Sequence, residues 1–393
     1  MTSPDLSSKI LIVADDLTGA LDAAGPFCER GFRVKTIVDA SIPFAWCDLL
    51  EADVVAVNTN SRHLSAQKAI QAINDCLGQL DLRSFQYVIK KIDSTLRGNV
   101  VSETLAVMDH CAIQEAYIAP AFPEQLRTVQ AGQVYIDGVA LSETEFVKDQ
   151  LSPAPRINIL EMFEIKDRAL LVSLNLESLH ADHGRNAIRV FDAIDIADLD
   201  RVVAGFLSKE QPCLLVGSSG VTSRLAFALP RRDNPLVARD TCHSFLYLVG
   251  SRSKRSLEQV SELEKRYFGS VYSATNGQLD DLPDPEGPVC AIVAQQDSDC
   301  VEQPNVVAAR LAKTSARYLR ILDPDVILVT GGDTALAFLR ELNVPILEVC
   351  GNLMAGVPMS LLSLDGQNKI LLTKAGGFGS PQLFVDVAEG MVR

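Results

Sequence analysis

Two adjacent aspartates, Asp15 and Asp16, follow the apolar run at residues 10–14 and precede a helical pattern. Carboxylates placed side by side raise each other's pKa unless a cation or a proton-accepting role compensates. Such a pair suits Mg²⁺ ligation or general-base catalysis. Capping of the following helix is the alternative, because Asp and Thr side chains accept hydrogen bonds from the first backbone amides of a helix.

A cationic stretch, Lys-Lys-Ile-Asp-Ser-Thr-Leu-Arg-Gly-Asn, occupies residues 90–99 ahead of a helix that starts near Val100. Helix amino termini carry partial positive charge, so Lys91 and Arg97 at this place indicate an anion between them. A solvated charged loop with Ser and Thr caps is the alternative. Arg62 could bind a carboxylate through two parallel hydrogen bonds, and so could Arg127. A single arginine in such a place is, however, more often an ordinary surface residue.

Glycine and serine residues follow three apolar runs in the carboxy-terminal part of the chain. They are Ser251-Arg252-Ser253 after 245–250, Gly331-Gly332-Asp333-Thr334 after 326–330, and Gly376-Gly377 after 369–373. Paired glycines let backbone amides approach a phosphate at a helix start, which favours a nucleotide site. The chain has no G-x-x-x-x-G-K-[ST] and no complete dinucleotide fingerprint, which argues against a P-loop enzyme and a dehydrogenase.

Short apolar runs rich in β-branched residues predict the strands that position these residues. They occur at 10–14, 54–57, 87–89, 116–119, 169–172, 213–217, 245–250, 289–294, 326–330 and 369–373. Runs without polar alternation are typical of parallel sheets buried on both faces. Helical spacing lies between them, as in Ala66, Ile70, Ile73, Leu77 and Leu80, and in Val307, Leu311, Tyr318 and Leu322.

The fold class is therefore α/β, with two doubly wound domains whose sheets are largely parallel. The polar, proline-bearing segment 230–243 separates them, and we place the domains at 1–235 and 236–393. The alternation of strand and helix patterns is interrupted between about 120 and 165, where we expect a loop-rich insertion with a hairpin around Asp137-Gly138.

The composition limits the partners. The 393 residues include 36 Lys and Arg against 50 Asp and Glu, a net charge of −14, and no run of basic residues exceeds two. Nucleic acid and membrane partners are therefore not expected. The nine cysteines lack any paired framework and no leader or membrane span is visible, so we expect a cytoplasmic protein. His180 and His183 have metal-like spacing without a third ligand, and we interpret them as loop residues.

Several motifs together resemble the four-carbon acid sugar kinase family. They are ADDLTGALD at 14–22, KKIDSTLRGN at 90–99, APAFPEQLRT at 119–128, VGS at 249–251, TGGDTA at 330–335, AGVP at 355–358 and KAGGFG at 374–379. The resemblance implies ATP-dependent phosphorylation of the terminal hydroxyl of D-threonate, D-erythronate or 3-oxo-tetronate. It also implies an amino-terminal sugar-acid domain and a carboxy-terminal nucleotide domain, with the active site in the cleft between them.

The resemblance assigns a role to each candidate residue. Those expected to touch the substrate are Asp15, Arg62, Lys90, Lys91, Ile92, Asp93, Ser94 and Arg127. Those expected to touch ATP are Ser251, Ser253, Gly331, Gly332, Asp333, Thr334, Gly376 and Gly377.

Phosphoryl transfer depends on positioning and charge neutralisation. Lys91 and Arg97 would hold the substrate carboxylate or the transferring phosphate, and Mg²⁺ would bridge the ATP oxygens. Asp16, rather than Asp333, is predicted to be the base. The chain departs from the family pattern at two places. Gln125-Leu126 stands where the family usually has Asn-Gly, and Arg252 stands where it usually has Cys. No oligomeric state is inferred.

Other classes of protein make distinguishable predictions. A non-catalytic sugar-acid or nucleotide sensor would keep the pocket without consuming ATP. A dehalogenase-like phosphatase would need Asp-x-Asp-x-Thr, and the residue two after Asp16 is Thr18. A hydroxy-acid dehydrogenase would need the dinucleotide fingerprint that the chain lacks. Since stereochemistry is read by pocket geometry, all three four-carbon acids remain candidates.

Overall fold

The computed structural model describes residues 9–149, 152–163, 171–174, 188–233, 242–279, 287–297, 300 and 302–391. The chain forms two compact units, Met1–Lys35 with Ala45–Asp233 and Thr36–Phe44 with Asn234–Arg393. The grouping of Thr36–Phe44 with the second unit was not expected from the sequence. His180 and His183, interpreted above as loop residues, lie outside the described residues.

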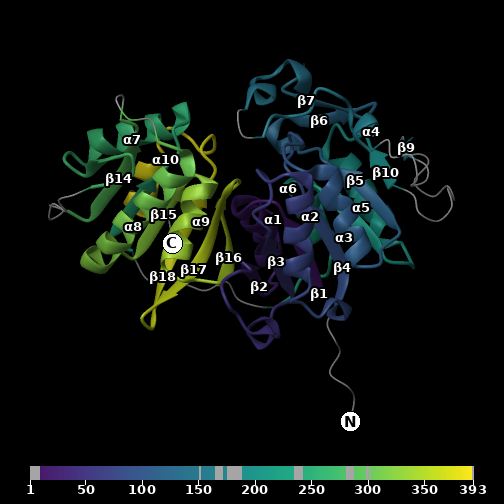
Figure 1. Cartoon of the computed structure of the whole chain (residues 1–393), viewed down its shortest axis with the longest axis horizontal. Coiled ribbons are helices and arrows are strands. Elements are labelled where there is room, and N and C mark those ends of the chain that lie inside the picture. The colour runs from purple at the N-terminus through teal and green to yellow at the C-terminus, as the bar shows by residue number, and fades with distance from the viewer. Residues whose placement is uncertain are drawn as a thin grey trace, which may run out of the picture. The chain divides into compact units, whose positions relative to one another are not determined.

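The first unit, drawn in purple to teal in Figure 1, is built on a parallel sheet with the strand order β3-β1-β4-β11-β5-β10-β9. Its strands are β1 (Lys9–Ala14), β3 (Val54–Asn58), β4 (Phe85–Lys91), β5 (Glu115–Ala119), β9 (Leu171–Leu174), β10 (Ile188–Phe191) and β11 (Cys213–Gly217), and β2 (Val34–Ile37) crosses the change of unit. Ile10 to Ala14 are 0% exposed, because helices cover both faces of the sheet.

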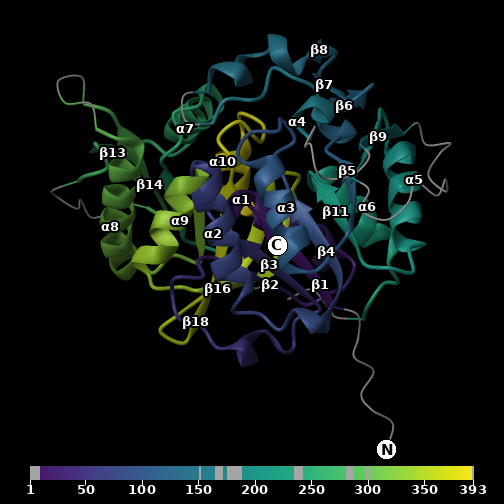
Figure 2. The same ribbon diagram turned by 45° about the vertical axis from the view of Figure 1, so that its right-hand side comes forward.

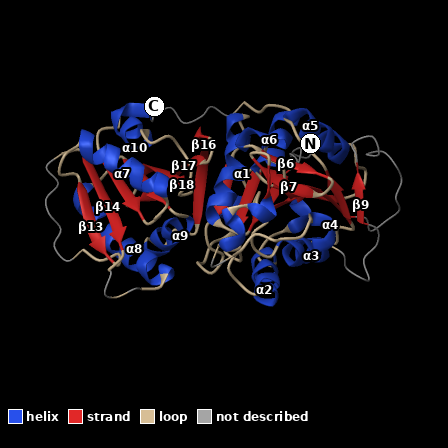
Figure 3. Cartoon of the chain, turned by 90° about the horizontal axis from the view of Figure 1, so that it is seen from above, coloured by secondary structure: helices blue, strands red, loops and turns tan. Residues whose placement is uncertain are grey.

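Helices of the first unit cover both faces of this sheet. Figure 3 shows α5 and α6 on one side and α2 and α3 on the other. The helices are α1 (Leu17–Glu29), α2 (Ala66–Leu77), α3 (Val100–His110), α4 (Ile159–Met162), α5 (Ile196–Leu207) and α6 (Ser219–Ala228), with 3₁₀ turns at Trp46–Leu49, Leu82–Ser84, Pro123–Gln125, Leu141–Glu143 and Glu145–Lys148. The helix predicted within 64–80 is confirmed as α2, but its buried face carries Ala69, Ile73 and Leu77, while Ile70 is exposed.

The loop-rich insertion forms a separate antiparallel sheet of β6 (Arg127–Gln130), β7 (Gln133–Ile136) and β8 (Val139–Ala140). Asp137 and Gly138 connect β7 to β8 with φ angles of 50° and 79°, which confirms the expected hairpin. Both views place this small sheet beside α4 (Figures 1 and 2). Since β5 leads directly into it, the insertion begins at the carboxyl edge of the main sheet.

The second unit, drawn mostly in green to yellow in Figure 1, has the strand order β13-β14-β12-β15-β18-β17-β16. Its strands are β12 (Phe245–Val249), β13 (Val271–Thr275), β14 (Val289–Gln295), β15 (Val326–Thr330), β16 (Ile346–Met354), β17 (Val357–Leu364) and β18 (Gln367–Lys374). Strands β16, β17 and β18 form an antiparallel meander, which the sequence did not predict, whereas the other pairs are parallel.

Helices cover both faces of this second sheet, with α7 and α10 on one side and α8 and α9 on the other (Figure 3). They are α7 (Lys254–Arg266), α8 (Pro304–Leu322), α9 (Gly332–Glu341) and α10 (Leu383–Asp386), followed by a π turn at Val387–Met391. The helix predicted from Val307 to Leu322 is confirmed as α8, whose Leu311 and Tyr318 are 0% exposed. The α/β class is confirmed in both units.

The topology brings the predicted site residues to two sheet edges. Asp15, Arg62 and the stretch 92–97 follow β1, β3 and β4, which are neighbouring parallel strands. In the second unit, residues 250–253, 331–334 and 375–377 follow β12, β15 and β18, which are also neighbours. Ligands of open α/β sheets bind at the carboxyl ends of strands, so each unit presents one candidate site.

Candidate active site

Asp15 and Asp16 share one arginine at the end of β1. Nε and Nη2 of Arg62 donate to Asp15 Oδ2 and Oδ1 at 2.8 and 2.9 Å, and Nη1 and Nη2 donate to Asp16 Oδ2 and Oδ1 at 2.9 and 2.8 Å. Asp16 Oδ1 also accepts from Gly19 N at 3.0 Å, so Asp16 caps α1. The guanidinium fork expected to hold a substrate carboxylate is therefore engaged by two aspartates of the chain.

The pKa values of the two aspartates shift in opposite directions because their surroundings differ. Burial opposes the ionisation of Asp15, but Arg62, Lys90 and Lys91 outweigh it and lower its pKa. Burial raises the pKa of Asp16, and the charge of Asp15 adds to this although Arg62 opposes it. The Asp15 side chain is 3% exposed and that of Asp16 is 23% exposed. Asp16 is thus the more accessible carboxylate and the better proton acceptor.

Lys90 does not face the site, contrary to the substrate-binding role expected of it. Its ammonium lies 2.8 Å from Glu103 Oε2 of α3, and both side chains are at most 1% exposed. Glu103 Oε1 also accepts a hydrogen bond from Ser61 at 2.7 Å. Successive residues of a strand point to opposite faces, so Lys90 and Lys91 cannot both turn toward α1. The sequence offered a signal in Glu103, an acid inside a predicted helix.

Lys91 lies on the face of β4 that turns toward α1. Its Nζ donates to Ile92 O at 3.1 Å, and a Cβ built on Gly19 would lie 3.3 Å from it. Lys91 is 5% exposed. In the part of the chain that the structure describes, no carboxylate lies within ion-pair distance of its ammonium. A buried ammonium in this state has hydrogen-bonding capacity for an anion.

Ile92 and Ser94 line the same loop in different ways. The Ile92 side chain is 1% exposed, its N–H donates to Gly217 O at 2.9 Å, and its carbonyl accepts from Lys91. These contacts hold Ile92 in the fold, and the substrate-binding role expected of it stays a prediction. Ser94 is 7% exposed, and its hydroxyl has no hydrogen bond to another described residue.

Asp93 and Arg97 pair within one loop. Arg97 Nε and Nη2 donate to Asp93 Oδ2 and Oδ1 at 2.8 and 3.2 Å, and the Thr95 hydroxyl also donates to Asp93. Burial opposes the ionisation of Asp93, but Arg62 and Arg97 hold its pKa far below the ordinary value. Arg97 Nη1 reaches Asp149 at 3.2 Å. Arg97 thus links this loop to Asp149 of the insertion, and the anion-binding role expected of it stays a prediction.

Arg127 begins β6 in the insertion. Its Nε is buried and has no hydrogen-bond partner, and no carboxylate of the described residues lies within ion-pair distance of the guanidinium. Burial and the charge of Arg97 lower the pKa of Arg127, while Asp93 and Asp22 oppose them. Arg127 is therefore close to the loop that carries Asp93. An arginine desolvated without a partner gains free energy when an anion supplies one.

Gly98 completes this edge of the sheet because no side chain fits there. Its φ is +88°, and an added Cβ would lie 3.1 Å from Asp15 Oδ2 and 3.3 Å from the Arg62 side chain. The loop can therefore pass close to the Asp15–Arg62 pair only with glycine at this position.

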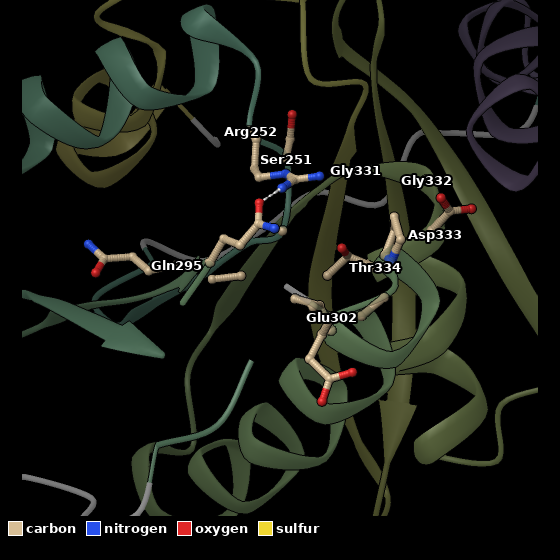
Figure 4. A pocket seen from close by; sticks show the side chains of 14 residues that line it. Ser251, Arg252, Gln295, Glu302, Gly331, Gly332, Asp333 and Thr334 are labelled. Atoms are coloured by element: carbon tan, nitrogen blue, oxygen red, sulfur yellow. Dashed lines mark hydrogen bonds between the residues drawn. The ribbon is translucent and has the colours of Figure 1, made fainter. Parts of the chain in front are cut away.

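A cavity in the second unit opens at the ends of β12, β14 and β15 (Figure 4). Its volume is about 170 Å³. The lining residues are Gly250, Ser251, Arg252, Ala294, Gln295, Gln296, Glu302, Pro304, Val307, Ala308, Gly331, Gly332, Asp333 and Thr334. The lining combines apolar side chains, such as Pro304 and Val307, with backbone at the start of α9, a combination that suits a base and its phosphates.

The sequence identified one wall of this cavity and missed the other. Ser251, Gly331, Gly332, Asp333 and Thr334 line it as expected. Gln295 and Gln296 were missed, although Gln295 is the last residue of β14 and Gln296 follows it, so the strand-end argument could have found them. The Arg252 guanidinium donates a hydrogen bond to Gln296 Oε1.

Ser253, Gly376 and Gly377 do not line the cavity but two of them support it. Ser253 caps α7 and donates to Gly376 O at 2.7 Å. A Cβ on Gly376 would lie 2.1 Å from Ser251 Oγ. The loop after β18 therefore packs directly against Ser251, which does line the cavity.

The described residues contain no group of three or more His, Cys, Asp or Glu side chains that could hold a metal ion. Among those same residues, no helix has the length and apolar character needed to cross a membrane.

The fold and these sites define an α/β protein with a cluster of buried charged residues at one sheet edge of the first unit and a cavity at a sheet edge of the second. A family model for a sugar-binding N-terminal domain matches residues 10–225, and a model for a nucleotide-binding C-terminal domain matches residues 288–384.

Known proteins are similar to this chain over nearly its whole length. A D-threonate kinase of Bordetella bronchiseptica is 30% identical over 97% of this chain and 96% of its own. A 3-oxo-tetronate kinase of Burkholderia multivorans is 26% identical over 95% of each chain. The crystal structure of a Salmonella typhimurium LT2 protein superposes with a TM-score of 0.76 at 19% identity, covering 96% of this chain and 98% of that one.

The chain belongs to the four-carbon acid sugar kinase family. This confirms the resemblance identified from the sequence motifs. It also confirms the prediction of a kinase that acts on four-carbon sugar acids, in preference to a non-catalytic sensor.

Proposed function

We propose that this chain transfers the γ-phosphoryl group of ATP to the terminal hydroxyl of a four-carbon sugar acid, with Asp16 as base and with Lys91 and Arg127 binding the acid. The observation that carries the proposal is the burial of Lys91 and Arg127 without an acidic partner. Both are largely withdrawn from water and lack a carboxylate partner among the described residues. A sugar-acid carboxylate would supply one, and two charge-assisted hydrogen bonds would fix its orientation.

The proposed step needs one proton acceptor. The substrate hydroxyl oxygen attacks the γ-phosphorus, the bond from that phosphorus to the β-bridging oxygen breaks, and ADP leaves with the electron pair. The hydroxyl proton passes to Asp16, whose raised pKa suits a temporary proton carrier. Asp15 stays ionised and, with Arg62, holds Asp16 in place.

The nucleotide would lie in the cavity of Figure 4. Its base would contact Ala294, Pro304, Val307 and Ala308, and its phosphates would approach Ser251 and the Gly331–Gly332 turn at the start of α9. Mg²⁺ would arrive with ATP and neutralise phosphate charge, and no protein ligand is assigned to it. The cleft between the domains, the cytoplasmic location and the lack of a nucleic-acid partner remain predictions.

The test is a substrate screen with the full chain. D-threonate, L-threonate, D-erythronate and 3-oxo-tetronates are each supplied with MgATP, and ADP release and the phosphorylated product are measured. We expect turnover with at least one four-carbon acid and none with the corresponding uncharged polyol, because the polyol cannot pair with Lys91 and Arg127. Equal turnover of acid and polyol would refute the assigned role of these cations.

A further inference from the structure

Lys374, the last residue of β18, buries a positive charge beside the nucleotide cavity without an acidic partner. Its side chain is 1% exposed. Its ammonium donates to the carbonyls of Ala375, Gly376 and Phe378 at 3.1, 3.0 and 3.2 Å. No Asp or Glu among the described residues lies within ion-pair distance of it. A buried ammonium without a counterion is costly, so this arrangement calls for an explanation.

The carbonyls that surround Lys374 also determine where the neighbouring amides point. In a trans peptide the C=O and the following N–H project to opposite sides. Because the carbonyls of Ala375 and Gly376 turn toward the ammonium, the N–H groups of Gly376 and Gly377 turn away from it. Neither N–H has an acceptor among the described residues. Successive free amides in a glycine turn are typical of a phosphate site.

Further contacts hold the same loop against the cavity. Ser253 and Ser256 donate to Gly376 O at 2.7 and 3.0 Å. The carbonyl of Lys374 itself accepts from Gly331 N at 2.9 Å, which links it to the turn that lines the cavity. Lys374 therefore joins both glycine segments that flank Ser251.

We propose that Lys374 is a positioning residue that shapes residues 375–378 into a second phosphate-binding wall of the nucleotide site. It gathers the loop carbonyls on one side and leaves the amides of Gly376 and Gly377 on the other. It touches no nucleotide atom and acts through the loop. The inference rests on the proposed function, because the ligand is the ATP phosphate chain.

Protonation gives the proposal a second readout. Burial, helped by the charge of Arg255, lowers the pKa of Lys374 to about 8. Arg255 of α7 is the charged group that faces it and is itself paired with Glu258 at 3.1 Å. The other neighbouring groups are the Ser256 hydroxyl and the ring of Phe384, neither of which titrates in this range. The neutral amine attracts the carbonyls less strongly, so the loop loosens as pH rises through 8.

The experiment measures ATP binding to the full chain by calorimetry at pH 7. Lys374→Met is expected to raise the Kd at least 10-fold, whereas Lys369→Met is expected to leave it unchanged. Lys369 is a matched control because it lies on the same strand and is almost as buried, but it pairs with Asp323. Gly377→Pro, which removes one outward amide without touching the ammonium, is expected to weaken binding as well.

The outcomes separate this inference from the proposed function. ATP binding by Lys374→Met that equals that of Lys369→Met overturns the positioning role while the kinase proposal stands. Failure of the wild type to bind ATP overturns both. If Lys374→Met does not fold, the wild type decides: a Kd that rises several-fold from pH 7 to 9.5 supports the proposal, and a constant Kd overturns it.

Discussion

Replacement of Asp16 by asparagine tests the base most directly, because asparagine keeps the shape and the capping oxygen but cannot accept the substrate proton. Loss of a general base costs about 10²–10⁴-fold in rate, so we expect turnover to fall roughly 10²-fold or more. The structure limits the accompanying loss of stability. Asn is as good an N-cap as Asp, so the bond from Gly19 N survives.

The expected change in the free energy of unfolding follows from the opposite pKa shifts of Asp15 and Asp16. Folding raises the pKa of Asp16, so the negative charge of Asp16 does not itself stabilise the fold. Asp16→Asn still weakens the hydrogen bonds to Arg62, which should lower the free energy of unfolding by about 1–2 kcal/mol. Folding lowers the pKa of Asp15, so Asp15→Asn breaks a favourable buried pair and should cost about 3–5 kcal/mol. The variants are thus ordered oppositely in turnover and in stability.

Steady-state ADP release at saturating ATP and urea unfolding measure the two quantities. Asp200→Asn is a control, because Asp200 forms an exposed ion pair with Arg224. We expect Asp16→Asn to lose turnover with ATP affinity nearly intact, and Asp15→Asn to lose mainly stability. Full turnover in Asp16→Asn together with none in Asp333→Asn would move the proton acceptor or metal ligand to the carboxy-terminal domain and refute the reasoning.

Three further predictions follow from single residues. Arg127→Met should weaken binding of the sugar acid by about 1–3 kcal/mol in calorimetry, yet melt at the same or a higher temperature, since the cation is buried without a partner. The pKa of Lys374 is about 8 in the folded chain, against 10.5 in the unfolded chain. Between these pH values the unfolded chain binds more protons, so the free energy of unfolding rises with pH. Relative to Lys374→Met, the wild type should gain up to about 3 kcal/mol in urea unfolding between pH 7 and 10.5, and a constant difference would contradict this. Leu126 has a φ of 56° and is 59% exposed, so Leu126→Gly should stabilise the fold by up to about 1 kcal/mol in thermal unfolding, after allowance for the entropy of glycine.

The sequence by itself determined the layers of both units and the sheet edges at which the candidate site residues lie. Apolar runs such as residues 10–14 are long enough and uniform enough to define buried parallel strands, and local spacing defined α2 and α8. The motifs around Asp15, Lys91 and Gly331 also indicated the family, which the comparisons confirmed. These are local properties of the chain, which do not depend on what packs against them.

Only the tertiary structure decided which charges are already paired. Lys90 and Lys91 are adjacent in sequence, but strand geometry sends Lys90 to Glu103 and leaves Lys91 without a carboxylate. Arg62 is engaged by two aspartates and Arg97 by Asp93 and Asp149, whereas Arg127 remains unpaired within the described chain. Such pairing depends on contacts between segments distant in sequence, so residue type alone cannot distinguish a cation that stabilises the fold from one that awaits a ligand.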